Sequence, residues 1–457
     1  MRTSNRELLF LVPALVLTTL GFALVYTTKS SLLTWSSLLY GGVFLALFAI
    51  AHIGRRFLVP YADPYLLPVT ALLSTLGILF IFRLDEQLAR QQALWLVVGL
   101  AAFLLTLVFV RRLDWLRDYR FVIGIAGLLL LLLTAGLGRE INGARLWVVF
   151  GPVRFQPAEF GKILLVVFFA GYLVDIREVL TVSTRRVLGL PLPPFRYLAP
   201  LLTIWGLSMV LMIFMKDLGT SLLFFGALLA LLYVATGRVF YVLVGLVLFL
   251  AGAAALYAVF PHVQTRVDIW LDPWQDTVGR GYQIVQSLFA LADGGVLGRG
   301  LGQGYLLLQS GNTIIPALET DFIFSAIGEE LGLIGGVGII LLYLIFLGRG
   351  LRIAARARDD FSRLLAAGLT SIFGLQAFLI LGGVTKLIPL TGITLPFVSY
   401  GGSSIVANFV LLALLLRTSD TVTRKEGEPV QPPPAPAPVP RPVLEDSSGV
   451  RPAEVKS

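Results

Sequence analysis

Long apolar stretches constrain this chain more than any other feature of its sequence. A bilayer core about 30 Å thick is crossed by about 20 mostly apolar helical residues, and only helices and closed barrels satisfy the backbone there. Twelve stretches approach this length, at 8–26, 32–52, 64–82, 93–110, 120–137, 161–175, 197–215, 219–236, 239–260, 323–348, 364–387 and 398–417. The sixth is short and the next two nearly touch, so ten or eleven spans are also compatible. We predict an all-α polytopic integral membrane protein with about twelve transmembrane helices.

The composition excludes several chemistries. Charged residues make up 14% of the chain, whereas soluble domains average about 25%. The absence of cysteine excludes disulfides, cysteine metal sites and thiol catalysis. His52 and His262 are the only histidines in the sequence, too few for a histidine-rich metal centre.

Positive charge predicts the orientation, because cytoplasmic loops of membrane proteins are enriched in Lys and Arg. The first residues and every second connection are basic, at 2–6, 55–56, 111–120, 177–196, 238, 349–363 and 417–425. We therefore expect both termini in the cytoplasm. The long outer loop, 261–322, has three Arg against six Asp and Glu. Topology thus accounts for the net charge of +9, and nucleic acid is excluded as a partner.

The carboxyl-terminal segment, 418–457, differs in composition from the rest. Past Arg424 it holds nine of the 24 prolines. Such a segment cannot bury a core, and we predict a disordered or polyproline II cytoplasmic tail. A solvated tail and a docking peptide are both compatible with this composition. The first apolar stretch is long enough to span the membrane and needs no signal-peptide interpretation.

Polar clusters at the outer ends of the spans are the candidate chemistry, because irregular polar sequence at membrane depth must line protein or a wet cavity. The first comprises NGARLW at 142–147 and QPAEFGK at 156–162, and helix capping would also explain Glu159. The second is Lys216 and Asp217 between two spans, which could instead be a snorkelling pair.

The outer loop supplies the third cluster. Its glycine run at 294–302 lacks the Gly-Lys-Ser/Thr ending of a phosphate-binding loop, so ATP is not implied. Asp321 lies where the loop becomes a helix, and capping is the alternative to a chemical role. Glu329 and Glu330 follow in an apolar helix, where an unpaired carboxylate would be costly. A fourth cluster, KLIPLTGITLPFVSYGGSS at 386–404, breaks helices or permits close packing.

These clusters, in this order, closely resemble the SEDS family (shape, elongation, division and sporulation) of RodA and FtsW. The resemblance covers roughly 64–417 and rests on NGARLW with QPAEFGK, KDLGTSL, WLDPW with GYQIVQS, TDFIFSAIGEELG, and IPLTGITLPFVSYGGSS. It implies a ten-helix catalytic core, with residues 1–63 adding a helix pair of unknown role. The string GGVTKLIPLTG favours the RodA-like subfamily over a division-specific FtsW-like one.

The resemblance implies a peptidoglycan glycan-strand polymerase in the bacterial cytoplasmic membrane, with its active site on the outer face. Such an enzyme moves the growing glycan from its polyprenyl pyrophosphate to the 4-hydroxyl of the next lipid II. Asp321 matches the essential aspartate of the family and is our general base. The implied substrate contacts are Arg145, Trp147, Glu159, Lys162, Lys216, Asp217, Lys386 and Ser399, with Arg266, Arg280 and Arg299 as secondary candidates.

The implied partner is a class B penicillin-binding protein. A divalent cation, Mg or Mn, could replace part of the positive charge, although no ligand set is legible in the sequence. The chain departs from the family pattern at Ala317 and Glu319, where Glu and His are common, and at Ile380 and Lys386. A lipid II flippase that uses intramembrane carboxylates and a noncatalytic scaffold are the alternatives.

Overall fold

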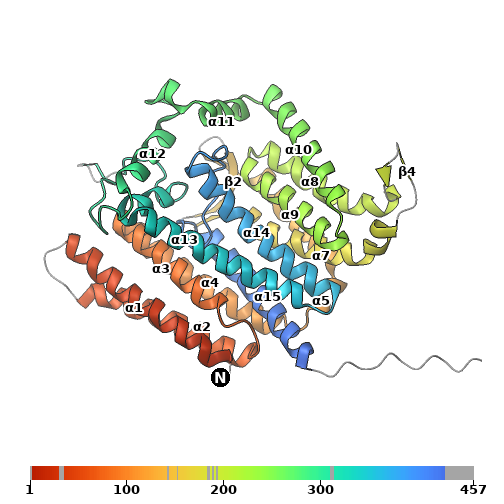
Figure 1. The fold of residues 1–457 in the computed structure, drawn as a ribbon, viewed down its shortest axis with the longest axis horizontal. Helices are drawn as coiled ribbons and strands as arrows, with labels where there is room; N and C mark the ends of the chain where they lie inside the picture. The colour runs from red at the N-terminus through yellow and green to blue at the C-terminus, as the bar shows by residue number, and fades with distance from the viewer. Residues whose placement is uncertain are drawn as a thin grey trace, which may run out of the picture.

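The computed structural model is a bundle of long helices with a helical cap at one end (Figure 1). It describes residues 3–29, 35–141, 144–151, 153–182, 186–187, 190–191, 194–308 and 313–427. The expectations for Asn142 and Gly143, and for the proline-rich segment from residue 428 onward, lie outside the described residues.

The first half of the chain contains eight helices within the described residues. They are α1 (Thr3–Lys29), α2 (Trp35–Leu58), α3 (Leu66–Leu84), α4 (Glu86–Phe109), α5 (Asp114–Asp118), α6 (Arg120–Leu137), α7 (Pro157–Val182) and α8 (Phe195–Phe214). The rest are α9 (Leu218–Thr236), α10 (Val239–Val259), α11 (Pro261–Leu271), the 3-10 helix η1 (Pro273–Asp276), α12 (Tyr282–Gly294), α13 (Ile323–Arg356), α14 (Asp360–Val384) and α15 (Gly402–Gly427).

Eleven helices in the described part of the chain are long and apolar enough to cross a membrane. They correspond to eleven of the predicted spans and confirm the all-α membrane fold. The remaining prediction, 161–175, lies in α7, which is not one of the eleven, so the count of about twelve is not confirmed. Helix α15 continues to Gly427, and the segment predicted as a tail from residue 418 therefore begins as helix.

The centre of the bundle is formed by α3, α14 and α15. Their membrane spans are 83%, 72% and 89% buried, whereas that of α10 is 6% buried and faces outward. Phe409 of α15 illustrates the packing, because its ring lies against those of Phe48, Phe103 and Phe397. A Cβ on Gly99 of α4 would stand 2.7 Å from the Phe409 ring, so this glycine permits the close approach of α4 and α15.

The last helix is also fastened to the segment between α2 and α3. The Tyr61 N–H donates to Asp420 Oδ1 at 2.8 Å, and the Asp63 N–H donates to Ser419 Oγ at 3.0 Å. Arg417 Nη1 donates to the Leu58 carbonyl at 3.0 Å. These bonds pair buried polar groups that would otherwise be left without partners.

Two short β-ribbons accompany the helices and were missed by the all-α prediction. Strands β1 (Arg139–Ile141), β2 (Ala144–Phe150) and β3 (Val153–Phe155) form an antiparallel sheet, in which Arg139 faces Trp147 and Glu140 faces Arg145. Strands β4 (Arg186–Val187) and β5 (Leu190–Pro191) form the other. Apart from the seven-residue β2, these strands have only two or three residues, too few alternating positions to predict from sequence.

The outer loop is mostly helical, and Figure 1 shows α11 and α12 lying across one end of the bundle. Its helices begin where the sequence favours a start. Pro261 opens α11, where a missing N–H has no cost, and Asp272 Oδ1 caps η1 by accepting from the Trp274 N–H at 3.1 Å. Helix α12 follows η1 and packs against α13.

Helix α13 is kinked and holds the glycine-rich loop. Gly332 has φ 66°, and a Cβ there would lie 2.2 Å from the Gly298 nitrogen. Glu330 accepts hydrogen bonds from the Gly302 N–H at 2.8 Å and from Arg83 Nε at 3.3 Å, and Glu329 accepts from the Tyr305 N–H. Both carboxylates are therefore paired, and they stabilise the loop at the kink.

Candidate active site

A cavity of about 200 Å³ lies beneath α11 and α12, where α13 begins and α14 ends. Its position follows from the fold, because the loop helices cover the ends of the two spans. Its lining brings together residues distant in sequence: Arg266, Ile269, Trp270, Arg280, Gln283, Ile284, Asp321, Gly383, Lys386, Ile388, Leu390 and Gly392.

Asp321 is held in this cavity by the turn that precedes α13. The Asp321 N–H donates to the Ala317 carbonyl at 3.0 Å, and Ala317 has a positive φ of 58°, which is unfavourable for a residue with a Cβ. Ser399 Oγ donates to the Thr320 carbonyl at 2.5 Å and accepts from the Leu395 N–H at 2.9 Å. Ser399 thus positions the turn beside Asp321 and does not line the cavity.

The charge state of Asp321 is set by two opposing effects. Burial raises the pKa of its carboxyl to about 6, and the nearby Arg266 guanidinium acts to lower it. A carboxyl with this pKa is mostly ionised at neutral pH and remains a better proton acceptor than an ordinary aspartate.

Arg266 on α11 faces the same space as Asp321. Its Nη1 donates to the carbonyls of Leu390 and Thr391 at 3.1 and 3.0 Å, which fixes the guanidinium. A Cβ added to Gly392 would stand 3.8 Å from Arg266 Nη2 and 3.9 Å from Asp321 Oδ2. Gly392, with φ 68°, therefore permits a tight turn that leaves the space between base and cation open.

Lys386 and Arg280 add positive charge to this cavity. The Lys386 backbone has φ 61°, and its carbonyl accepts from Trp270 Nε1 at 3.2 Å. Its ammonium group makes no hydrogen bond or ion pair with the described residues. Arg280 Nε lies 3.7 Å from Asp276 Oδ2. Three cations and one carboxylate line the cavity, a balance suited to a pyrophosphate.

Asp217 lies outside the cavity lining but within the electrostatic reach of Arg266. It caps α9, where its Oδ1 accepts from the Thr220 N–H at 3.0 Å, while its buried Oδ2 has no partner within the described residues. Burial raises the pKa of Asp217, and the Arg266 charge opposes this. Asp217 is therefore placed to act on Arg266, with no contact to the cavity.

Glu159 and Lys162, which were predicted as substrate contacts, are buried in the bundle and bond to each other. Lys162 is 1% exposed, and its Nζ donates to Glu159 Oε2 at 2.5 Å and to Gln376 Oε1 at 2.7 Å. Gln376 continues the network by donating to the Thr394 carbonyl at 2.8 Å. The pair joins α7 to α14 and does not line the cavity.

Arg145, Trp147 and Lys216 form a separate region around the β-ribbon. Lys216 Nζ and Arg145 Nε lie 3.7 and 3.8 Å from the Glu140 carboxylate, and the Arg145 N–H donates to the Met215 carbonyl at 3.3 Å. Trp147 pairs with Arg139 in the ribbon. None of the three lines the cavity.

Of the three arginines predicted as secondary candidates, the structure places two in the cavity. Arg266 and Arg280 line the cavity, whereas Arg299 pairs with Asp293 at 3.1 Å and lies over the Tyr305 ring. Trp270 and Gln283, which carried no predicted role, are cavity residues, and Gln283 Nε2 donates to the Pro316 carbonyl at 3.0 Å. Their motifs, WLDPW and GYQIVQS, were visible in the sequence, but the helices that bring them to Asp321 were not.

Comparisons with known proteins agree with this architecture. Peptidoglycan glycosyltransferase RodA of Mycobacterium tuberculosis is 46% identical over 434 residues, which cover 92% of this chain and 91% of the relative. The RodA of Mycobacterium leprae is 46% identical over 91% of this chain and 90% of its own length. Stage V sporulation protein E of Bacillus subtilis is 34% identical over 78% of this chain and 96% of its own length.

Solved structures give the same result. A chain from a peptidoglycan synthase complex, described as coordinating polymerization and crosslinking, has a TM-score of 0.65 and 30% identity, and the match covers 80% of this chain and 99% of that one. The rod shape determining protein RodA of Thermus thermophilus has a TM-score of 0.53 and 28% identity, covering 80% and 98%. The FtsW, RodA and SpoVE family model, described as a cell cycle protein, matches residues 65–424. This chain belongs to the FtsW, RodA and SpoVE family.

Proposed function

We propose that this protein polymerises peptidoglycan glycan strands from lipid II for cell elongation and shape. The proposal rests on one observation: Asp321 lines the same cavity as three cations, Arg266, Arg280 and Lys386. A glycosyl transfer from a pyrophosphate carrier needs a base for the acceptor hydroxyl and cations for the leaving group. The identity of 46% to proteins named peptidoglycan glycosyltransferase RodA supports an enzyme of this class and favours the elongation role.

In the proposed reaction, the 4-hydroxyl of the incoming disaccharide attacks the anomeric carbon of the growing glycan. The new glycosidic bond forms as the bond from that carbon to the pyrophosphate oxygen breaks. Asp321 takes the hydroxyl proton, and the electron pair leaves with the polyprenyl pyrophosphate. A single displacement inverts the anomeric centre and needs no covalent enzyme intermediate.

Arg266 and Lys386 are the proposed contacts to the departing pyrophosphate. Arg266 is held by two carbonyls, so its guanidinium does not have to be ordered during the reaction. The Lys386 ammonium has no partner among the described residues and is available to phosphate oxygens. Asp217 supports the positive charge of Arg266 through their electrostatic interaction.

A divalent cation fits this cavity only together with the substrate. The described residues contain no group of three or more Asp, Glu or His that could hold a metal ion, and Asp321 is the one carboxylate in the cavity lining. Mg²⁺ is usually bound through one or two carboxylates plus substrate phosphates. Asp321 and the pyrophosphate would hold such an ion, which would supply further positive charge to the leaving group.

The proposed topology places both termini in the cytoplasm and the cavity on the outer face of the bacterial cytoplasmic membrane. The basic loops support this orientation. The proposed partner is a class B penicillin-binding protein, and the similarity to a chain from a synthase complex that polymerises and crosslinks supports it.

Asp321→Asn tests the function, because Asn keeps the shape and hydrogen bonds of the turn but cannot accept the proton. General base catalysis typically contributes 10²- to 10⁴-fold, so we expect polymerisation of lipid II by purified protein with its transpeptidase to fall at least 10²-fold. Asp268→Asn on α11 is the matched control: it makes the same charge change in an exposed residue that does not line the cavity.

A flippase for the same lipid is the competing function, and one observation weighs against it. Of the three carboxylates that it would use, Glu329 and Glu330 are bound by loop N–H groups and Arg83, and Asp217 caps α9 through its Oδ1. Lipid accessibility should be measured in vesicles beside glycan product on the same preparation. Altered lipid movement with near-normal polymer in Asp321→Asn would contradict the enzyme and support the flippase.

A further inference from the structure

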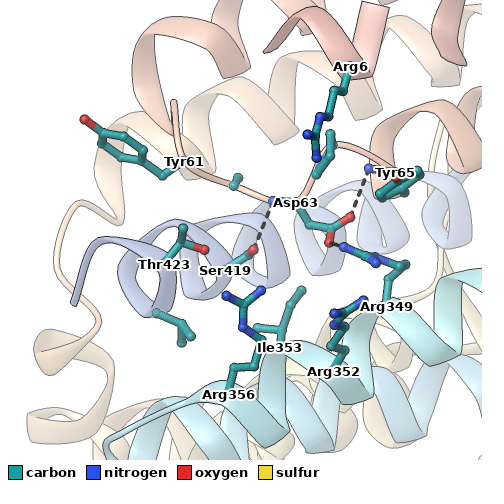
Figure 2. A pocket seen from close by; sticks show the side chains of 13 residues that line it. Arg6, Tyr61, Asp63, Tyr65, Arg349, Arg352, Ile353, Arg356, Ser419 and Thr423 are labelled. Atoms are coloured by element: carbon teal, nitrogen blue, oxygen red, sulfur yellow. Dashed lines mark hydrogen bonds and ion pairs between the residues drawn. The ribbon is translucent and has the colours of Figure 1, made fainter. Parts of the chain in front are cut away.

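A second cavity, of about 280 Å³, lies at the other end of α13 from Asp321. Arg349, Arg352 and Arg356 line it from the last turns of α13, and Arg6 reaches it from α1 (Figure 2). At about 1.5 Å per residue, Arg352 lies some 45 Å along the helix from Asp321. The remaining lining is Tyr61, Ala62, Asp63, Pro64, Tyr65, Ile353, Ser419, Val422 and Thr423.

The three arginines of α13 project from one side of the helix, because spacings of three and four residues share a face. Two of them are neutralised. Arg349 Nε donates to Asp63 Oδ2 at 2.8 Å, and Arg356 Nε donates to Glu426 Oε1 at 2.9 Å. Arg6 and Arg352 have no carboxylate partner within the described residues. The cavity therefore carries two uncompensated positive charges.

Other groups in the cavity suit a phosphate ester. The Arg349 guanidinium lies 4.5 Å from the centre of the Tyr65 ring, and this contact restrains it at the cavity wall. The Thr423 side chain lines the cavity from α15 and supplies a neutral hydroxyl donor (Figure 2). Arginine guanidinium groups bind phosphate oxygens with paired hydrogen bonds, and hydroxyls complete such sites.

The cavity also borders the lipid-facing surface. Leu8, Leu9 and Phe10 follow Arg6 along α1 and are 48%, 62% and 42% exposed. The Phe10 ring centre lies 5.0 Å from that of Tyr65, so an apolar surface continues directly from the cavity wall. A headgroup bound by the arginines could thus keep its acyl chains in the bilayer beside α1.

The helix pair α1–α2 is fixed in the position that makes this cavity. Glu7, one residue after Arg6, is fully buried and pairs with His52 Nδ1 at 2.6 Å and Arg55 Nε at 2.9 Å. Residue 6 therefore has a defined place relative to Arg352.

We propose that Arg6 and Arg352, with Thr423, form a binding site for the phosphate group of an anionic phospholipid, beside the Arg349–Asp63 pair. The volume of about 280 Å³ lies just below the usual range for ligand pockets, about 300–1,000 Å³, and suits one headgroup. In the proposed topology the site opens to the cytoplasmic leaflet, where basic pockets bind such lipids. The amino-terminal helix pair thereby completes a lipid site by contributing Arg6.

The experiment uses the full chain in nanodiscs of phosphatidylcholine with and without phosphatidylglycerol. Phosphatidylglycerol retained by the purified protein is measured by native mass spectrometry after transfer to detergent. The test variant combines Arg6→Gln and Arg352→Gln. The control is the double variant with Arg112→Gln and Arg117→Gln. It removes the same amount of charge from exposed arginines that do not line the cavity.

We expect the test variant to retain at least tenfold less phosphatidylglycerol than the wild type or the control, since each lost arginine removes a charge-assisted bond. Equal retention by all three proteins would overturn the proposal. Competition with inorganic phosphate and glycerol phosphate distinguishes the source. Weak displacement supports a membrane lipid, whereas displacement by either at low concentration overturns the lipid assignment in favour of a soluble phosphate. The readout is independent of glycan synthesis and of the function proposed above.

Discussion

Arg266 affects Asp321 without an ion pair between them. Its positive charge favours the ionised carboxylate and so opposes the rise in the pKa of Asp321 that burial causes. Because a base must be ionised to accept a proton, kcat/KM should fall as the pH drops below about 6 and level off above it. Removing the Arg266 charge should raise the pKa of Asp321 further.

We therefore predict that Arg266→Gln moves the acidic limb of the kcat/KM profile to higher pH, whereas Arg266→Lys leaves it closer to the wild type. The profile is measured with lipid II across the range where the protein stays folded. Arg280→Gln is the matched control, because Arg280 lines the same cavity but the positive charge that opposes the rise in the pKa of Asp321 is that of Arg266. Equal movement of the limb in both Gln variants would refute a specific effect of Arg266.

The site residues differ in how well the sequence alone could predict them. Asp321 was predictable as a candidate, since an aspartate at an outer loop-to-helix junction is visible without a fold. Arg266 was only a secondary candidate, because nothing in a sequence of mixed polarity shows that α11 folds back over residues 390–392. The burial of Lys162 was not predictable, because one of its partners, Gln376, lies 214 residues away.

The buried Glu159–Lys162 pair of helix α7 can be tested for a structural role. Lys162 and Glu159 are both buried in this helix, so Lys162→Met leaves a carboxylate without its cation, at a cost of about 3 kcal/mol. We expect a lower Tm for this variant and near-normal polymerisation by the molecules that remain folded. A large loss of rate at unchanged Tm would instead return Lys162 to a substrate role.

Lys216 is the counterpart, since it is 48% exposed and lies 3.7 Å from Glu140 at the turn between α8 and α9. Exposed pairs contribute little to stability, and we predict an unchanged Tm for Lys216→Gln. If Lys216 contacts the carrier, this variant should use lipid II about tenfold less well. Unchanged kinetics together with a reduced Tm would assign Lys216 to the turn alone.

The elements themselves were predictable to different degrees. Apolar runs of about 20 residues located eleven spans, because the bilayer leaves a helix few alternatives. The β-ribbon at 139–155 and the helices of the outer loop lie outside that constraint, and their structure depends on contacts with the bundle ends. Helix α7 contains five charged residues, which shorten its apolar run, so the sequence predicted only the short span 161–175 there.

For the whole molecule, we predict that deleting residues 1–60 lowers stability but preserves polymerisation by the folded protein. The cavity with Asp321 is lined only by residues from 266 to 392, whereas α1 and α2 pack on α3 and α4. The deletion removes two spans together, so every later loop keeps its side. Tm and glycan product are measured on the purified protein, and a well-folded deletion protein that makes no polymer would contradict the prediction.

The hydrogen bonds between α15 and the segment after α2 join an early part of the chain to the last helix to be synthesised. The N–H groups of Tyr61 and Asp63 are synthesised 359 and 356 residues before the side chains that accept from them. Contacts this distant in sequence form late, because a long loop must close first. These two bonds therefore form only after the final helix has been inserted, and they then fasten that helix to the segment between α2 and α3.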